Sequence, residues 1–227
     1  GTNPSLVAAG ACKALAEWDL RNNLDSKGAI LFQRFAERLL GSLTYLPSGT
    51  SAGYYLLGNA LWTNQFSTGD PIHTPNGMNK LNPLISQALS GAVADLQAAG
   101  IPLDGAPREW QHDQRAGKSI PIHGGEGDLG LFNAISSVWD PQAGYSEVPH
   151  GTSFIASIGF KRKGKRKGCP VKALTFVTYG QSENPSSRHA TDYTRAFSRK
   201  RWNAVPFCKR EVRRQALTTK RVTGPRR

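Results

Sequence analysis

The spacing of apolar residues changes along this chain, and that change constrains the fold more than any other feature. In the first hundred residues, apolar side chains recur every three to four positions, which is typical of helices with one buried face. From residue 152 the segment TSFIASIGF alternates, and residues 171–180 are rich in Val, Thr and aromatic side chains. A charged link with glycines joins the two segments. The pattern predicts an antiparallel hairpin behind a helical region, and therefore an α+β chain.

Three helices are expected in the helical region. The first lies within residues 6–20, and the second spans 29–43 after an expected N-cap at Asp25 or Ser26. The third lies within 82–100, where proline stands just inside the start and glycine just past the end. The apolar positions at helical spacing in the first two are Val7, Ala11, Ala14, Leu15, Trp18, Leu31, Phe35 and Leu39.

Residues 101–150 show an irregular pattern of prolines, glycines and short apolar groups, and we expect no regular element from it apart from a short strand in SIPIH. Behind the hairpin, Asp192 is the expected N-cap of one helix, and residues 209–217 continue the helical bias. We therefore expect a mainly helical segment over 1–118, and a segment over 119–227 that holds loop, hairpin and C-terminal helices.

The charges are divided unevenly between the two halves of the sequence. The first 150 residues carry nine Lys/Arg and thirteen Asp/Glu, whereas residues 151–227 carry twenty Lys/Arg and three Asp/Glu. Such asymmetry predicts a basic face that binds an acidic partner: nucleic acid, an anionic surface or an acidic subunit. The run Lys161–Lys167 has no interleaved aromatic residues for base stacking, so a solvated hairpin tip is favoured over a nucleic-acid site.

Three glycines, Gly125, Gly127 and Gly130, fall in the G-x-G-x-x-G spacing of a dinucleotide-binding turn. Glu126 and Asp128 stand inside this turn, where their carboxylates would repel a phosphate. The segment that follows is a poor helix former, and no repeated strand–helix units surround it. We interpret the stretch as a structural loop and expect no nucleotide cofactor.

The sequence contains no recognisable metal or catalytic cluster. The five histidines never lie three or four residues apart, and no C-x-x-C pair or G-x-S-x-G turn is present, so no metal ligand is assigned. His112 stands beside Asp113, but adjacent side chains on a helix or strand point apart. Cys169 and Cys208 are available to form one disulfide in an exported protein. No apolar run reaches the roughly 20 residues of a membrane-spanning helix. The histidines are His73, His112, His123, His150 and His189.

Five stretches of this sequence, in the same order, resemble the C-terminal part of the penicillin acylase family. They are ACKALAEWDLRNNLDSKGAILFQRF, DPIHTPNGMN, PIHGGEGDLGLFNAI, HGTSFIASIGF and LTFVTYGQSENPSSRHATDYTRAFSRKRW. The similarity is greatest to the branch with aculeacin A (cyclic lipopeptide) acylases and acyl-homoserine lactone acylases. Arg188 replaces a usual proline and Ala190 a usual aromatic residue, which affects the expected local loop geometry.

This resemblance implies an N-terminal-nucleophile hydrolase with an αββα core, to which the helices and hairpin of this chain contribute. Its members hydrolyse an amide between a fatty or aryl acyl chain and an amine, without a cofactor. The nucleophile is a serine that self-cleavage exposes at the start of a β subunit. Gly1 has no side chain, and Thr2 would serve only after removal of Gly1. We assign no catalytic residue here and expect the nucleophile outside this chain.

The resemblance also implies partners and a location. We expect the α subunit and an upstream β-subunit segment of the same precursor, an acyl-amide or lipopeptide substrate, and a secreted or periplasmic enzyme. The alternative is a non-catalytic basic module that binds nucleic acid or an anionic surface, for which affinity would fall steeply with salt. A degenerate acylase homologue that serves as a scaffold is the third hypothesis.

Overall fold

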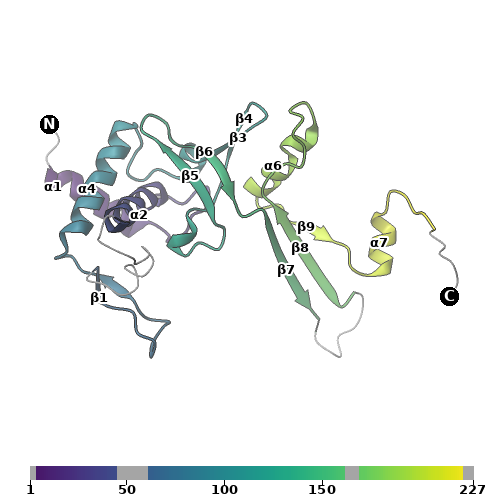
Figure 1. The fold of residues 1–227 in the computed structure, drawn as a ribbon, viewed down its shortest axis with the longest axis horizontal. Helices are drawn as coiled ribbons and strands as arrows, with labels where there is room; N and C mark the ends of the chain where they lie inside the picture. The colour runs from purple at the N-terminus through teal and green to yellow at the C-terminus, as the bar shows by residue number, and fades with distance from the viewer. Residues whose placement is uncertain (1–3, 45–60, 162–168, 222–227) are drawn as a thin grey trace. The chain divides into compact units, whose positions relative to one another are not determined.

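The computed structural model describes residues 4–44, 61–161 and 169–221, in two compact units over 1–151 and 152–227 (Figure 1). The first unit holds three long helices, α1 (Pro4–Glu17), α2 (Ala29–Thr44) and α4 (Pro83–Ala98). All three helices expected from the sequence are therefore confirmed. They share one apolar core, which buries Ala11, Ala14, Ile30, Leu31, Phe35, Leu39, Leu61, Ala88, Ala92, Val93, Leu96, Ala99, Ile101 and Tyr145.

The two ends of α4 have the start and stop residues that the sequence predicts. The Asn82 side chain accepts a hydrogen bond from the Leu84 N–H at 3.0 Å, and Pro83 occupies the first turn. Gly100 follows the helix with a φ of +68°, in the left-handed region that glycine adopts without strain.

The expected cap of α2 is wrong. The helix begins at Ala29, directly after Gly28, whose φ is +83°. A Cβ on Gly28 would lie 2.8 Å from the Ala14 carbonyl oxygen, so only glycine fits between α1 and α2. Ser26 instead accepts a hydrogen bond from the Asn23 N–H, at 3.2 Å. Asp25 accepts one from Arg108, at 2.8 Å.

The interval 101–150 is more regular than its pattern predicts. After the short helix α5 (Pro107–Trp110) it forms two antiparallel hairpins. The first joins β3 (His112–Arg115) to β4 (Lys118–Pro121), which includes part of the SIPIH strand. The second joins β5 (Ile135–Asp140) to β6 (Gly144–Gly151). Two register shifts interrupt the β5–β6 pairing, which removes the alternation by which a strand is recognised. A further pair, β1 (Trp62–Asn64) and β2 (Asn76–Met78), precedes α4.

The second unit contains the predicted hairpin. β7 (Phe154–Phe160) pairs with β8 (Val171–Val177) along its whole length, and β9 (Asn203–Val205) adds to the other side of β8. α6 (Asp192–Ser198) packs on this sheet, and α7 (Lys209–Gln215) follows β9 (Figure 1). The hairpin and both C-terminal helices are confirmed.

Asp192, however, is the first residue of α6 rather than its cap, because Thr191 occupies the N-cap position. The Asp192 carboxylate accepts a hydrogen bond from the next backbone N–H, that of Tyr193, at 2.7 Å. Its charge still lies at the helix N-terminus, where the helix dipole favours an anion. Mixed helices and small antiparallel sheets confirm the α+β class. The αββα core and the division at residue 118 stay predictions.

No helix in the described part of the chain combines the length and the apolar character needed to cross a membrane.

Leu96→Ala is expected to lower the free energy of unfolding by about 3 kcal/mol, because Leu96 is completely buried between the helices and its truncation leaves a cavity. Leu81→Ala is the matched control, since Leu81 is 92% exposed and should change the free energy by less than about 0.5 kcal/mol. Urea denaturation of the two variants measures both values, and equal losses would contradict the assigned core.

Candidate functional site

The glycine-rich turn directs its backbone groups into the protein. The Gly124 N–H donates to the Asn22 carbonyl at 3.0 Å, and the Gly125 N–H donates to the Asn133 carbonyl at 3.4 Å. A Cβ on Gly125 would lie 2.6 Å from the Asn22 amide nitrogen and 2.7 Å from Leu131. Side chains therefore occupy the space that a pyrophosphate would need, and the turn has a structural role.

Glu126 also turns toward its own chain. Its carboxylate accepts hydrogen bonds from the Ser136 hydroxyl and the Ser137 N–H, each at 3.2 Å. Glu126 thus fixes the turn to β5. The side chain of Asp128 lies outside the described residues.

A group of amide side chains lies around the turn, with Gln33 and Gln111 buried and Asn22 and Asn133 half-buried, and we call it the amide cluster: Asn22, Gln33, Gln111 and Asn133. The Asn22 amide donates to the Gly124 carbonyl at 2.7 Å, and so does the Gln111 amide, at 3.0 Å. Asn133 donates to the His123 carbonyl at 2.9 Å. These bonds join the α1–α2 connection to a turn about one hundred residues later. Amides bind and orient backbone groups, but they supply neither a nucleophile nor a base.

An ionic cluster joins α2 to α4. The Asp95 carboxylate accepts from the Arg34 guanidinium at 2.6 Å and from two nitrogens of Arg38, each at 2.6 Å. Gly91, one turn earlier on α4, makes room for this contact, because a Cβ there would lie 2.5 Å from an Arg38 nitrogen. Burial raises the pKa of Asp95, but the hydrogen bonds and charges of the two arginines outweigh that effect and hold it below its ordinary value.

The ionic cluster extends to Glu37 and Tyr145. Arg34 donates to Glu37 at 3.1 Å, and its guanidinium lies 4.6 Å from the centre of the Trp139 ring, a cation–π distance. Burial raises the pKa of Glu37 in spite of Arg34. Tyr145 is completely buried, and burial followed by the adjacent Glu37 charge raises its pKa well above the ordinary value. The cluster balances two arginines with two carboxylates, which favours a structural clamp over a reactive centre.

Two exposed histidines have carboxylate partners. Nδ1 of His73 lies 2.7 Å from Asp70, and Nδ1 of His189 lies 2.7 Å from Asp192. His150 is exposed on β6. Both carboxylate pairs are local contacts between exposed side chains three residues apart, and we assign them no catalytic role.

The remaining histidines lie on or near the β3–β4 hairpin. Burial lowers the pKa of His112, and the neighbouring Asp113 carboxylate pairs with Arg115 at 3.2 Å instead of with His112. His123 is buried, with its Nδ1 3.2 Å from the Asn133 amide nitrogen. Asp113 thus has Arg115 as its charged partner.

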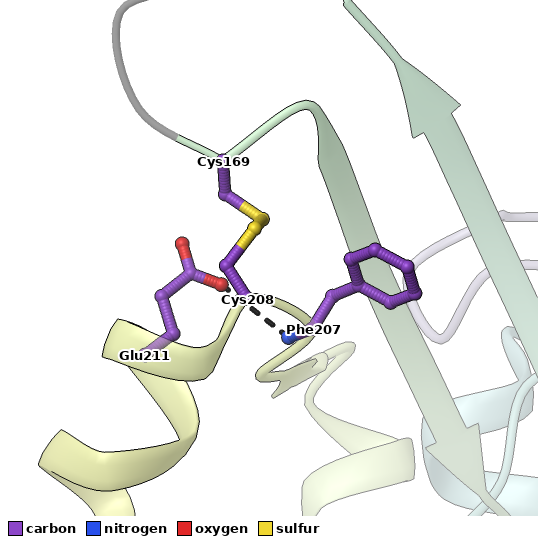
Figure 2. Close-up of a disulfide and its surroundings, with 4 residues drawn as sticks. All are labelled: Cys169, Phe207, Cys208 and Glu211. Carbon is purple, nitrogen blue, oxygen red and sulfur yellow. Dashed lines mark hydrogen bonds between the residues drawn. A yellow bond between two sulfur atoms is a disulfide. The ribbon is translucent and has the colours of Figure 1, made fainter.

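Within the described residues, one group brings three potential metal ligands together: Cys169, Cys208 and Glu211, whose ligand atoms lie within 4.8 Å of one another. The two sulfurs form a disulfide (Figure 2). The Glu211 carboxylate accepts a hydrogen bond from the Phe207 N–H at 3.3 Å. Metal binding by cysteine requires the thiolate, so this group is a covalent link from the hairpin to α7. The third cysteine, Cys12, is free and exposed.

Several sequence features that we considered for function lie outside the described residues. Apart from Lys161, the basic run Lys161–Lys167 lies outside the described residues, and so do Gly1 and Thr2. The absence of a catalytic residue from this chain stays a prediction. No sequence pattern reveals the ionic cluster, because its partners are 57 and 61 residues apart in sequence. Its one local signal is Asp95, a single carboxylate in the otherwise uncharged helix PLISQALSGAVADLQA.

Comparison with known proteins identifies relatives over nearly the whole chain. The sequence model of the family described as penicillin amidase matches residues 3–214. An acyl-homoserine lactone acylase (PvdQ) of Pseudomonas syringae pv. syringae strain B728a is 34% identical over 207 residues, which cover 89% of this chain and 24% of the relative. The aculeacin-A acylase of Actinoplanes utahensis is 32% identical over 203 residues, 89% of this chain and 22% of the relative. The chain thus spans about a quarter of the length of these relatives.

Asp95→Asn is expected to lower the free energy of unfolding at pH 7 by about 2–3 kcal/mol, because it leaves Arg34 and Arg38 without their shared carboxylate. The loss is smaller than for a fully buried pair, since Arg38 is 38% exposed. Asp25→Asn, which breaks the exposed pair with Arg108, is the matched control and should cost less than about 1 kcal/mol.

The difference between wild type and Asp95→Asn should also depend on pH. The pKa of Asp95 is lower in the folded than in the unfolded state, so the unfolded state binds more protons in acid. The stabilisation is therefore complete above about pH 4, the unfolded pKa, and is lost as the pH falls through the folded pKa. Urea denaturation between pH 6 and pH 3 measures it, and a constant difference over that range would contradict the ion pair.

Cys208→Ser is expected to loosen the second unit, because the disulfide closes a loop with a sequence separation of 39, worth about 4 kcal/mol in the chain-entropy model. Hydrogen exchange of the β8 and β9 amides should become faster. Cys12→Ser leaves the disulfide intact and should exchange like wild type. Unchanged protection in Cys208→Ser would show that the link does not stabilise the sheet.

Proposed function

This chain belongs to the penicillin amidase family, and from that membership we propose that it is the C-terminal segment of an acylase β subunit. The complete enzyme would hydrolyse the amide bond between a fatty or aryl acyl chain and an amine. The observation that carries the proposal is the extent of the family match, which runs from residue 3 to residue 214 and so includes residues of both compact units.

The proposed substrates follow the names of the relatives. Those relatives are acylases of acyl-homoserine lactones and of aculeacin A, a lipopeptide. Both names denote removal of an acyl group, and penicillin amidase names the same amide chemistry. We therefore propose an acyl-homoserine lactone, a lipopeptide or a penicillin-type amide as substrate, with water as the second reactant.

The proposed mechanism places the reacting groups outside this chain. A serine at the start of the β subunit attacks the amide carbonyl while its own α-amino group, with a pKa near neutrality, accepts the hydroxyl proton. The amine leaves with that proton, and water then hydrolyses the acyl–serine ester to release the carboxylic acid. Hydrogen-bond donors stabilise the oxyanion in both steps. The amide and ionic clusters of this chain would serve as rigid support for that centre.

The complete enzyme would be a heteromer. Because the chain spans about a quarter of its relatives, we propose that the α subunit and an upstream β-subunit segment complete it within the αββα core of N-terminal-nucleophile hydrolases. We further propose a secreted or periplasmic location, which the Cys169–Cys208 disulfide supports, since such bonds persist in oxidising compartments. Family membership does not favour the alternative of a basic nucleic-acid-binding module.

The test is an assay of the complete acylase that contains this segment. The matured enzyme should release a free amine from a long-chain acyl-homoserine lactone, an acylated lipopeptide or an aryl-acyl amide. Replacement of the β-subunit N-terminal serine with alanine in a separately expressed β subunit should lower the rate at least about 1,000-fold. A matured, assembled protein that hydrolyses none of these amides would reject the proposal and support a scaffold role.

A further inference from the structure

Two adjoining cavities lie where the disulfide connects the β7–β8 hairpin to α7. One has a volume of about 290 Å³ and the other of about 250 Å³, and Cys169, Glu211 and Arg214 line both. All of their lining residues belong to the second unit. We call the two cavities together the basic pocket, after its charged residues Lys161, Lys172, Arg210, Glu211 and Arg214.

The charge of this pocket is mainly positive and is not neutralised locally. Lys172, Arg210 and Arg214 are exposed, and none of the three pairs with a carboxylate within the described ranges. Glu211 is the one carboxylate in the lining, and it accepts a hydrogen bond from the Phe207 N–H at 3.3 Å (Figure 2). Residues 152–227 carry twenty Lys/Arg against three Asp/Glu, so this unit has few carboxylates with which to balance the pocket.

The walls between these charges are apolar. Val171 of β8, Val205 of β9 and the following Pro206 line the larger cavity. Apolar walls have a low dielectric constant, so they concentrate the field of cations that share one cleft. Among the described residues, no aromatic side chain lines either cavity, and the pocket therefore lacks a stacking surface for nucleic-acid bases.

The backbone fixes the segments that carry the cations. The disulfide links Cys169, just before β8, to Cys208, directly before α7 (Figure 2). Arg210 and Arg214 are four residues apart on α7, so they lie on the same side of that helix. The Lys161 N–H donates to the Pro170 carbonyl at 2.8 Å, which holds the end of β7 beside the start of β8. An anion would thus bind between segments that are already linked, which lowers the cost of ordering them.

We infer that the basic pocket binds a phosphate-type oxyanion, either as a free phosphate compound or as the headgroup of a phospholipid. A phosphate group carries about two negative charges and three acceptor oxygens, so it satisfies more than one cation at a time. The arginine guanidinium is suited to it because it donates two parallel hydrogen bonds. Arg214, which lines both cavities, is the central ligand, with Lys172 in the larger cavity and Arg210 in the smaller one. Amide hydrolysis needs no such anion, so this site goes beyond the proposed function.

The first experiment measures the binding of inorganic pyrophosphate to the complete acylase by calorimetry at constant ionic strength. Arg214→Gln and Arg213→Gln each remove one positive charge from α7, but Arg213 lines neither cavity. Arg214→Gln should raise the Kd at least about 10-fold, because it removes charge-assisted hydrogen bonds. Arg213→Gln should stay within about 2-fold of wild type, since it changes only the general charge. Equal increases would indicate general charge attraction and overturn the inference.

The second experiment changes the shape of the pocket without changing its charge. A double variant, Cys169→Ser with Cys208→Ser, removes the link between the hairpin and α7 and should weaken pyrophosphate binding at least about 5-fold, because the cations are no longer held together. Cys12→Ser leaves the disulfide intact and should bind like wild type. Wild-type affinity in the double variant would overturn the inference, since binding would then follow charge alone.

Vesicles distinguish the two sources of the phosphate group. Cosedimentation with phosphatidylglycerol vesicles that Arg214→Gln abolishes, and with which pyrophosphate competes, would support the site with a lipid headgroup as its ligand. Pyrophosphate binding without such cosedimentation would support it with a free phosphate compound. An assembled acylase that binds neither pyrophosphate nor these vesicles would overturn the inference. None of these measurements involves hydrolysis, so the outcome is independent of the proposed function.

Discussion

The carboxylate of Asp95 is the interaction on which the helical unit depends. It accepts hydrogen bonds from two arginines of α2 and so fixes the position of α4 against that helix. The apolar residues around it determine that the helices associate, but apolar contacts tolerate sliding. The charged contact does not, because either arginine would lose its partner if α4 moved by one turn. Gly91 is part of the same constraint, since any side chain there would displace Arg38.

The glycine-rich turn has the glycine spacing of a nucleotide-binding turn, but its hydrogen bonds are those of a structural turn. A nucleotide turn keeps its N–H groups available for phosphate. Here the N–H groups of Gly124 and Gly125 donate to backbone carbonyls. The amides of half-buried Asn22 and buried Gln111 both donate to the Gly124 carbonyl. Gly124 and Gly125 are required because Asn133 and Asn22 approach them too closely for a Cβ, which is a packing requirement rather than a ligand requirement.

Elements with a strong local pattern could be predicted from the sequence, and contacts between distant segments could not. The long helices and the β7–β8 hairpin have regular apolar periods, and α4 has Asn82 and Gly100 at its ends. The β3–β4 strands have four residues each, and β5–β6 is bulged, so neither shows a period. The pairs of Asp25 with Arg108 and of Asp95 with Arg38 depend on tertiary packing, which no local pattern encodes. The expected cap at Asp25 or Ser26 failed for the same reason, because those side chains have partners outside α2.

The two units differ in how far they bury their apolar side chains. The first unit builds one apolar core around three helices and pairs the charges of Asp95, Arg34 and Arg38 between two of them. The second unit is a three-stranded sheet with α6 packed on one side and a disulfide that links the β7–β8 hairpin to the start of α7. A sheet stabilises itself only when both faces are either polar or covered. The face with Phe154 and Ile158 meets neither condition, and a covalent link at one end does not remove apolar surface from water. Within the second unit, the disulfide therefore restrains the chain, whereas Phe154 and Ile158 of that face stay largely exposed.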